Sequence, residues 1–283
     1  MRDPRRSAAG ALWATPAIVG VAAFFLLPAV AVVLLAFTSW NLLGAPTWVG
    51  PSNLLTAITS DSTARALAVT ISIGATSVAI EIVVGLALAK ALVASSRTGF
   101  ARAILLIPWM VAPITVGVVA RWLLAPSDGL LAGLLGHRVD VLVDPFGAPL
   151  AVAAVVAWQA TGFAALVYAA ALRAIPSELR AAAALDGAGR WNVLRRLEWP
   201  LLRPITFFLL VTASIRSFAL YDLIVPLTGG GPNGATRTVS ALIVGQAWES
   251  FDIGRAAALA CVVTVVELAV VGAQWAWYRR RET

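Results

Sequence analysis

Six long apolar stretches divide the chain, and polar or Gly- and Pro-rich segments separate them. The stretches cover about residues 12–38, 66–93, 102–124, 149–172, 205–227 and 256–278. About 20 consecutive apolar residues are needed for a helix to cross a hydrocarbon core roughly 30 Å thick. Because a segment in lipid must satisfy its backbone hydrogen bonds internally, we expect each stretch to be helical. The pattern therefore predicts an all-α integral membrane protein with six transmembrane helices.

Composition supports this prediction. Of the 283 residues, 60% are hydrophobic and only 12% are charged, whereas soluble domains carry about 25% charged residues. The formal net charge is +7, but the cations gather beside the apolar stretches, which indicates a membrane surface and not nucleic acid. The single cysteine, Cys261, rules out an intrachain disulfide, and the single histidine, His137, leaves too few ligands for a histidine-based metal site.

The N-terminal pattern also has features of a signal peptide, because Arg2, Arg5 and Arg6 precede an apolar run. That run continues from about Ala11 to Phe37, whereas the apolar region of a signal peptide is only about 7–15 residues long. We therefore expect an uncleaved first transmembrane helix.

Lys and Arg are distributed unequally between the two sets of segments that flank the spans. One set holds fifteen of them: Arg2, Arg5, Arg6, Lys90, Arg97, Arg102, Arg173, Arg180, Arg190, Arg195, Arg196, Arg203, Arg279, Arg280 and Arg281. The opposite set holds four: Arg65, Arg138, Arg237 and Arg255. Since cytoplasmic loops carry the excess of Lys and Arg, we predict that both termini are cytoplasmic.

The segments expected on the outer side are about residues 39–65, 125–148 and 228–255. They are rich in Gly, Pro, Asn and Asp, which favour turns, and the glycines at 229–231 can adopt backbone angles closed to other residues. None of these segments is long or apolar enough to fold alone. We therefore expect one transmembrane domain, residues 1–283.

A cationic, Ala-rich segment, residues 174–204, interrupts the apolar pattern. The hydroxyl of Ser177 can cap a helix N-terminus, and Glu178 then lies in the first turn, where the helix dipole favours an anion. We expect residues 179–185 to be helical. Two glycines should end that helix, Gly187 and Gly189.

A second short helix is expected from Trp191 to Leu197, before Pro200 and Pro204 redirect the chain into the membrane. A helix faced with Ala can approach closely into a groove, as a docking element must. The alternative is an ordinary amphipathic connector on the cytoplasmic side.

Three groups of residues carry a resemblance to a known family. The first comprises Ile175-Pro176-Ser177-Glu178-Leu179, Ala182-Ala183, Asp186-Gly187-Ala188, Trp191, Leu197, Pro200 and Pro204. The second comprises Leu227-Thr228-Gly229-Gly230-Gly231-Pro232, Gln246-Ala247, Phe251-Asp252-Ile253-Gly254 and Ala256. The third comprises Val49-Gly50-Pro51-Ser52-Asn53-Leu54, Thr98-Gly99-Phe100-Ala101-Arg102 and Ile107-Pro108-Trp109. Together they resemble the maltose-type permease subunits of carbohydrate ABC importers, in particular actinobacterial sugar-uptake permeases.

The resemblance implies the permease fold of type I ABC importers and a multi-pass subunit of the bacterial plasma (inner) membrane that forms half of a sugar pathway. It implies four kinds of partner: a second permease, two copies of a cytoplasmic ABC ATPase, an extracellular substrate-binding lipoprotein and the sugar itself. ATP and Mg would be bound by the ATPase, and this chain would hold no cofactor. Membrane lipid surrounds such a subunit, and nucleic acid has no place in its function.

The resemblance also assigns a coupling helix that docks into the ATPase. Its matching residues are Glu178, Ala181, Ala182, Ala183, Asp186 and Gly187. Family members usually carry Glu where this chain has Ala181, so an ionic contact to the ATPase from that position is not expected here.

Enzyme motifs are absent from the sequence. There is no Gly-x-x-x-x-Gly-Lys-[Ser/Thr] loop, and the only lysine, Lys90, lies at a membrane edge. His-Glu-x-x-His and Gly-x-Ser-x-Gly motifs are also absent. The alternative function is a secondary transporter driven by an ion gradient, which paired inverted repeats would favour; the sequence shows no internal repeat.

Charged residues inside the spans are candidates for the transport pathway, because each costs roughly 2.5–3.5 kcal/mol on insertion scales. They are Glu81, Arg121, Arg216, Asp222 and Glu267. The resemblance selects Gln159 and Phe163 on the fourth span, and Arg216 and Ser217 on the fifth, as pathway residues; two neighbours that can stack on a sugar ring are Trp158 and Tyr221. The alternative for Arg216 is a structural ion pair with Glu81 or Glu267.

Overall fold

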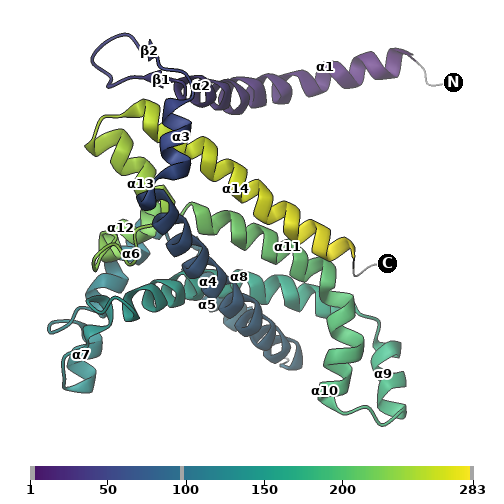
Figure 1. Ribbon diagram of the computed structural model, residues 1–283. Coiled ribbons are helices and arrows are strands. Elements are labelled where there is room, and N and C mark those ends of the chain that lie inside the picture. The colour runs from purple at the N-terminus through teal and green to yellow at the C-terminus, as the bar shows by residue number, and fades with distance from the viewer. Residues whose placement is uncertain (1–3, 96–98, 281–283) are drawn as a thin grey trace. The chain divides into compact units, whose positions relative to one another are not determined.

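The computed structural model describes residues 4–95 and 99–280, and almost all of them lie in helices or short turns (Figure 1). Three of the cations used to predict orientation, Arg2, Arg97 and Arg281, and Thr98 of the family motif lie outside the described residues. Contacts group the chain into two units, one within Met1–Ala64 and Ile243–Val266 and one within Arg65–Leu242 and Glu267–Thr283. The single domain expected over residues 1–283 stays a prediction.

The first unit begins with a long apolar helix. Helix α1 (Pro4–Val21), the π-helical turn η1 (Ala22–Leu26) and α2 (Leu27–Leu35) follow one another directly. A two-stranded antiparallel sheet, β1 (Thr38–Ser39) and β2 (Thr47–Trp48), and helix α3 (Ser52–Thr59) come next.

Small side chains form the core of the first unit, where Ala36, Ala57, Ala257 and Ala258 are buried together. The amide of Asn53 donates to the carbonyls of Ala36 at 3.2 Å and Thr38 at 2.9 Å. This side chain therefore fixes α3 to the end of the first helix. The π-helical turn η4 (Gly245–Glu249) and the start of α14 (Ile253–Arg279) complete the unit.

The second unit holds the remaining helices, except for the first four residues of α4 and the last two of α13. In chain order they are α4 (Asp61–Ala94), α5 (Gly99–Met110), α6 (Pro113–Leu123), α7 (Leu130–Leu135), η2 (Asp140–Leu142), α8 (Gly147–Ala174), α9 (Ser177–Leu185), α10 (Arg190–Val193), η3 (Leu194–Glu198), α11 (Trp199–Phe218), α12 (Tyr221–Thr228) and α13 (Val239–Val244). Helix α5 packs on α8, and α6 packs on α12. Two clusters form its core, one around Val152 and Ile224 and one around Tyr168 and Leu209.

Among the described residues, five helices are long and apolar enough to cross a membrane, and a bent pair makes six if it counts as one crossing. The five are Trp13–Leu35, Asp61–Ala94, Gly147–Ala174, Arg190–Phe218 and Ile253–Arg279. An all-α membrane protein is therefore confirmed, and the predicted six spans are reached if the bent pair is counted as one.

The third predicted span, 102–124, is wrong as one straight helix. Helices α5 and α6 meet at an angle of 97°. Pro113 begins α6, and Ala112 before it has φ −58° and ψ 135°, outside the helical region. Because the proline ring disfavours the helical conformation of the preceding residue, the break falls at Ala112.

The fifth predicted span, 205–227, is wrong at both ends. The helix begins at Arg190, continues through Pro200 and Pro204 and ends at Phe218. The helix does not break at the two prolines, because a π-helical turn, η3, precedes them and local π geometry accommodates missing backbone donors. After the break at 219–220, α12 is a separate helix.

The glycine-rich turn after α12 is sharp, as expected. Gly229 and Gly230 have φ of +63° and +84°, in the left-handed region that favours glycine. The fully buried Thr236 closes the loop, since its hydroxyl donates to the carbonyl of Gly231 at 2.7 Å and lies 2.7 Å from the hydroxyl of Thr228.

Candidate functional site

An ion pair lies inside the second unit, between α4 and α11. Arg216 Nη2 is 2.6 Å from Glu81 Oε2, and the exposed fractions of the two side chains are 31% and 3%. Of the two structural partners considered for Arg216, the ion pair is with Glu81. The other carboxylate oxygen, Glu81 Oε1, is buried without a hydrogen-bond partner.

Aromatic rings extend this ion pair towards α8. The guanidinium carbon of Arg216 lies 4.8 Å from the centre of the Trp109 ring. Trp109, near the end of α5, stacks on Phe163 of α8 with 4.7 Å between ring centres. Gln159, one helical turn before Phe163, donates to the carbonyl of Val111 at 2.9 Å. These residues (Glu81, Trp109, Gln159, Phe163 and Arg216) are called the Arg216 cluster below, and they join α4, α5, α8 and α11.

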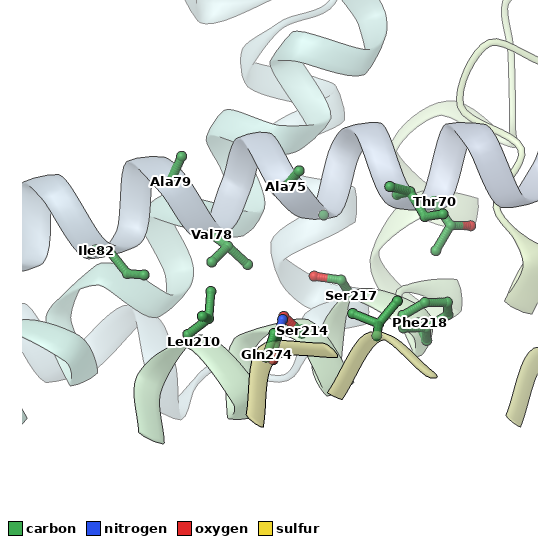
Figure 2. Close-up of a pocket in the computed structure, with 13 residues that line it drawn as sticks. Thr70, Ala75, Val78, Ala79, Ile82, Leu210, Ser214, Ser217, Phe218 and Gln274 are labelled. Carbon is green, nitrogen blue, oxygen red and sulfur yellow. The ribbon is translucent and has the colours of Figure 1, made fainter. Parts of the chain in front are cut away.

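The cluster contains three of the six predicted pathway residues, and the other three lie elsewhere. Ser217 is buried, donates to the carbonyl of Ala213 at 2.9 Å and lines a hollow of about 320 Å³ between α4, α11 and the end of α14. In Figure 2 it lies beside Ser214 and Gln274, whose amide donates to Ser214 Oγ at 2.7 Å. Trp109 and Arg216 do not line this hollow.

Trp158 is exposed and lines a second hollow of about 700 Å³. Apart from the hydroxyl of Thr115, the side chains that line this hollow are apolar, and most of them come from α6, α7, η2 and α8. Tyr221 is half-buried at the first position of α12. The expectation that Tyr221 and Arg216 share one helix is therefore wrong, because the chain breaks after Phe218.

The remaining charges expected inside spans lie near helix ends or on a partly exposed face. Arg121 is exposed in the last turn of α6, and Asp222 is exposed in the first turn of α12. Each charge has the sign that the helix dipole favours at its end. Glu267 is half-buried on α14. Within residues 4–95 and 99–280, no three His, Cys, Asp or Glu side chains are grouped to hold a metal.

The cationic loop folds as a short exposed helix, α9, and a return helix that begins with α10. Helix α9 starts at Ser177, close to the expected start, but Ser177 makes no capping hydrogen bond because it is the first helical residue and Pro176 holds the cap position. Glu178 lies in the first turn, as expected. At the other end, Gly187 has φ +71°.

Two hydrogen bonds terminate α9, from Ala188 N to the carbonyl of Ala183 at 3.0 Å and from Gly187 N to that of Ala184 at 3.1 Å. This pair is the Schellman arrangement, which needs a residue with positive φ at the glycine position. The predicted break at Gly187 is confirmed.

No residue of α9 is buried. Five of the six predicted docking residues are exposed and one, Ala183, is half-buried: Glu178, Ala181, Ala182, Ala183, Asp186 and Gly187. Two large apolar side chains beside them are also open, Leu185 at 90% and Trp191 at 69%. The loop therefore presents a small, partly apolar surface around a short helix.

Sequence reasoning missed two residues that the structure places centrally. Trp109 entered only as part of a family motif, although an aromatic side chain directly after an in-span proline was a signal. Glu198 was not singled out, although it is the only acid among the many cations of residues 190–203. It forms ion pairs with Lys90 and Arg180.

Membrane-crossing helices, a polar cluster among them and an exposed helical loop between two of them define a membrane transport subunit. The sequence matches the family described as binding-protein-dependent transport system inner membrane component over residues 81–281. The chain belongs to this family of permease components and is a transporter subunit and not an enzyme.

Two curated relatives illustrate the match. The sn-glycerol-3-phosphate transport system permease protein of Agrobacterium fabrum is 30% identical over 83% of this chain and 82% of its own length. The trehalose/maltose transport system permease protein of Thermococcus litoralis is 32% identical over 82% of this chain and 81% of its own length. A crystal structure of a bacterial ABC transporter involved in the import of the acidic polysaccharide alginate shares the fold, with a TM-score of 0.83, 22% identity, and 98% and 96% of the two chains covered.

The family match makes this a multi-pass inner-membrane component that works with a substrate-binding protein. It decides against the ion-gradient transporter that the sequence left as an alternative, and it confirms the ABC importer permease fold.

Proposed function

We propose that this chain forms half of the pathway of an ATP-driven importer for carbohydrates, together with a second permease. Relatives named for trehalose/maltose and for multiple sugars support a sugar substrate, and those named for sn-glycerol-3-phosphate support the wider class of polyhydroxylated solutes. An external binding lipoprotein delivers the solute.

The observation that carries the proposal is the exposed surface of α9. Helix α9 has no buried residue, and its last residue, Leu185, and Trp191 of α10 leave apolar area uncovered. A groove in a cytoplasmic ATPase covers this area, and Ala181, Ala182 and Ala183 lie where the helix and the groove come closest. Two such ATPases bind ATP and Mg and move the loop when they close.

The Arg216 cluster supplies the polar contacts of the pathway. A guanidinium has five donors, and the pair with Glu81 leaves others for sugar hydroxyl oxygens. The rings of Trp109 and Phe163 offer faces for the apolar side of a sugar. Ser217, Trp158 and Tyr221 contact the solute at other stages of its passage.

Orientation follows from charge. The loop at 174–204 and both termini lie on the cytoplasmic side, where the fifteen flanking cations gather. The ATPase meets α9 only with this orientation.

Reconstitution tests the proposal. The subunit is assembled with its second permease and ATPases in vesicles, and ATP hydrolysis is measured with the binding protein and each of maltose, trehalose and sn-glycerol-3-phosphate. We expect hydrolysis to be stimulated, and the labelled solute to accumulate, for one of these three. If the loaded binding protein does not change the rate of ATP hydrolysis by the complex, the proposed function is contradicted.

A further inference from the structure

The carboxylate of Glu198 joins three elements that are far apart in the sequence. Its Oε2 lies 2.9 Å from Lys90 Nζ at the end of α4, and its Oε1 lies 3.5 Å from Arg180 Nε on α9. Glu198 itself ends the π-helical turn that leads into α11. Its side chain is 8% exposed, whereas those of Lys90 and Arg180 are 35% and 33% exposed.

Arg180 has a second partner that fixes α9 to α8. Its Nη2 donates to the carbonyl of Leu172 at 2.6 Å. Leu172 lies in the last turn of α8, where carbonyls lack intrahelical partners and the dipole favours a cation. One residue further on, Arg173 donates to the carbonyl of Leu92 on α4 at 3.4 Å. The coupling helix is therefore bound through Arg180 at a single point to both α8 and the start of α11.

The burial of Glu198 separates this arrangement from an ordinary surface ion pair. Exposed pairs contribute little, because water screens them and both side chains must be ordered. A buried carboxylate with two cations gives up its hydration, so each partner matters and deletion of one leaves an uncompensated charge. Without Glu198, Lys90 and Arg180 would face each other with no acid between them.

We propose that Lys90, Arg180 and Glu198 form a clamp that makes α9 move as one body with α4 and α11. These two helices also carry Glu81 and Arg216, so displacement of α9 reaches the Arg216 cluster through them. The three residues are positioning residues for coupling. The inference rests on the proposed function, since it takes α9 to be the element that the ATPase moves.

The clamp is tested by distance measurement between spin labels on α9 and α4. Cys261 is replaced by Ser, and labels are placed at two exposed positions, Ala184→Cys and Ala91→Cys. In the assembled complex the distance distribution should be narrow and should stay the same with and without ATP. Glu198→Gln should broaden the distance distribution, and Lys90→Arg should leave it narrow.

Coupling is measured in the same vesicles as the amount of solute transported per ATP hydrolysed, with whichever of the three solutes stimulates hydrolysis by the wild type. We expect Glu198→Gln to lower this ratio about fivefold or more, the range of ordinary coupling free energies, while the complex elutes intact in size exclusion. Arg196→Gln is the matched control, since it removes a charge from an exposed position of the same π-helical turn. Its ratio should equal that of the wild type.

The outcomes separate the clamp from the proposed function. A narrow distance that survives Glu198→Gln overturns the clamp, and a lost distance with an unchanged transport ratio overturns its role in coupling. Should Glu198→Gln fail to assemble, Lys90→Gln decides, because that side chain is partly exposed and its loss breaks one pair only. If the loaded binding protein does not stimulate ATP hydrolysis by the wild-type complex, the proposed function is contradicted. The distances between the spin labels still test the clamp in that case.

Discussion

Replacing Arg216 by Ala should destabilise the subunit, because it strands a buried carboxylate. Glu81 is 3% exposed, its one paired oxygen contacts Arg216 at 2.6 Å, and its other oxygen has no partner. Breaking a buried ion pair by deletion of one member costs about 3–5 kcal/mol. Since each 1.36 kcal/mol is a factor of ten, the ratio of folded to unfolded subunit should fall roughly 150- to 5,000-fold.

Replacing Glu81 as well shows whether the uncompensated carboxylate causes the loss of stability. The double variant Glu81→Gln/Arg216→Gln replaces the ion pair by neutral amides and should recover much of the loss, as contacting residues typically couple by about 0.5–3 kcal/mol. The assay is the melting midpoint and the yield of intact complex in detergent. Arg121→Ala is the control, because Arg121 is exposed and its charge interacts with the dipole at the end of α6. If Arg216→Ala has the same melting midpoint as Arg121→Ala, the reasoning is refuted.

A conservative change separates stability from transport. Arg216→Lys keeps the charge beside Glu81 but loses the planar group that lies over Trp109. Since the proposed pathway uses that group, we expect a normal yield of complex and reduced uptake in vesicles. Uptake equal to that of the wild type would remove the guanidinium from the pathway.

Three further predictions follow from the glycines and from the missing nucleotide motif. Gly187→Arg should abolish uptake yet leave insertion intact, because a bulky cation stands at an open position with φ +71°, whereas Gly187→Asn, which tolerates that angle, should retain most uptake. Gly162→Ala should destabilise the complex by about 1–3 kcal/mol in thermal melting, since its new carbon overlaps the carbonyl of Leu105, and Gly133→Ala, with open space, should be neutral. The purified chain alone should not hydrolyse ATP, and turnover by uncontaminated protein would contradict the importer assignment.

The apolar pattern predicted where helices lie but not where they break. Pro113 was visible in the sequence, yet prolines inside membrane helices are often tolerated, and only the non-helical backbone of Ala112 shows that this one breaks the span. Pro200 and Pro204 illustrate the reverse, because the π-helical turn before them has no signature in residue types. Local composition alone does not distinguish the two cases.

The cationic loop at residues 174–204 was more predictable than the Arg216 cluster. Its helix depends on neighbouring residues, so Glu178 in the first turn and Gly187 at the end were readable from sequence. The Arg216 cluster depends on which faces of distant helices meet. Glu81 and Arg216 are 135 residues apart, and nothing local shows that Ser217, next to Arg216, lines a hollow that Arg216 does not line.

The separation of Glu81 and Arg216 also has a consequence for biosynthesis. At about 5–20 residues per second, a ribosome needs roughly 7–27 s to make the 135 residues between them. During that time α4 has left the ribosome with an acid that has no counterion, at an insertion penalty of roughly 2.5–3.5 kcal/mol. Only emergence of α11 removes the penalty. A truncated chain that ends after α8 therefore keeps a charged helix in the bilayer, so we expect proteases that survey the membrane to degrade it faster than the full-length subunit.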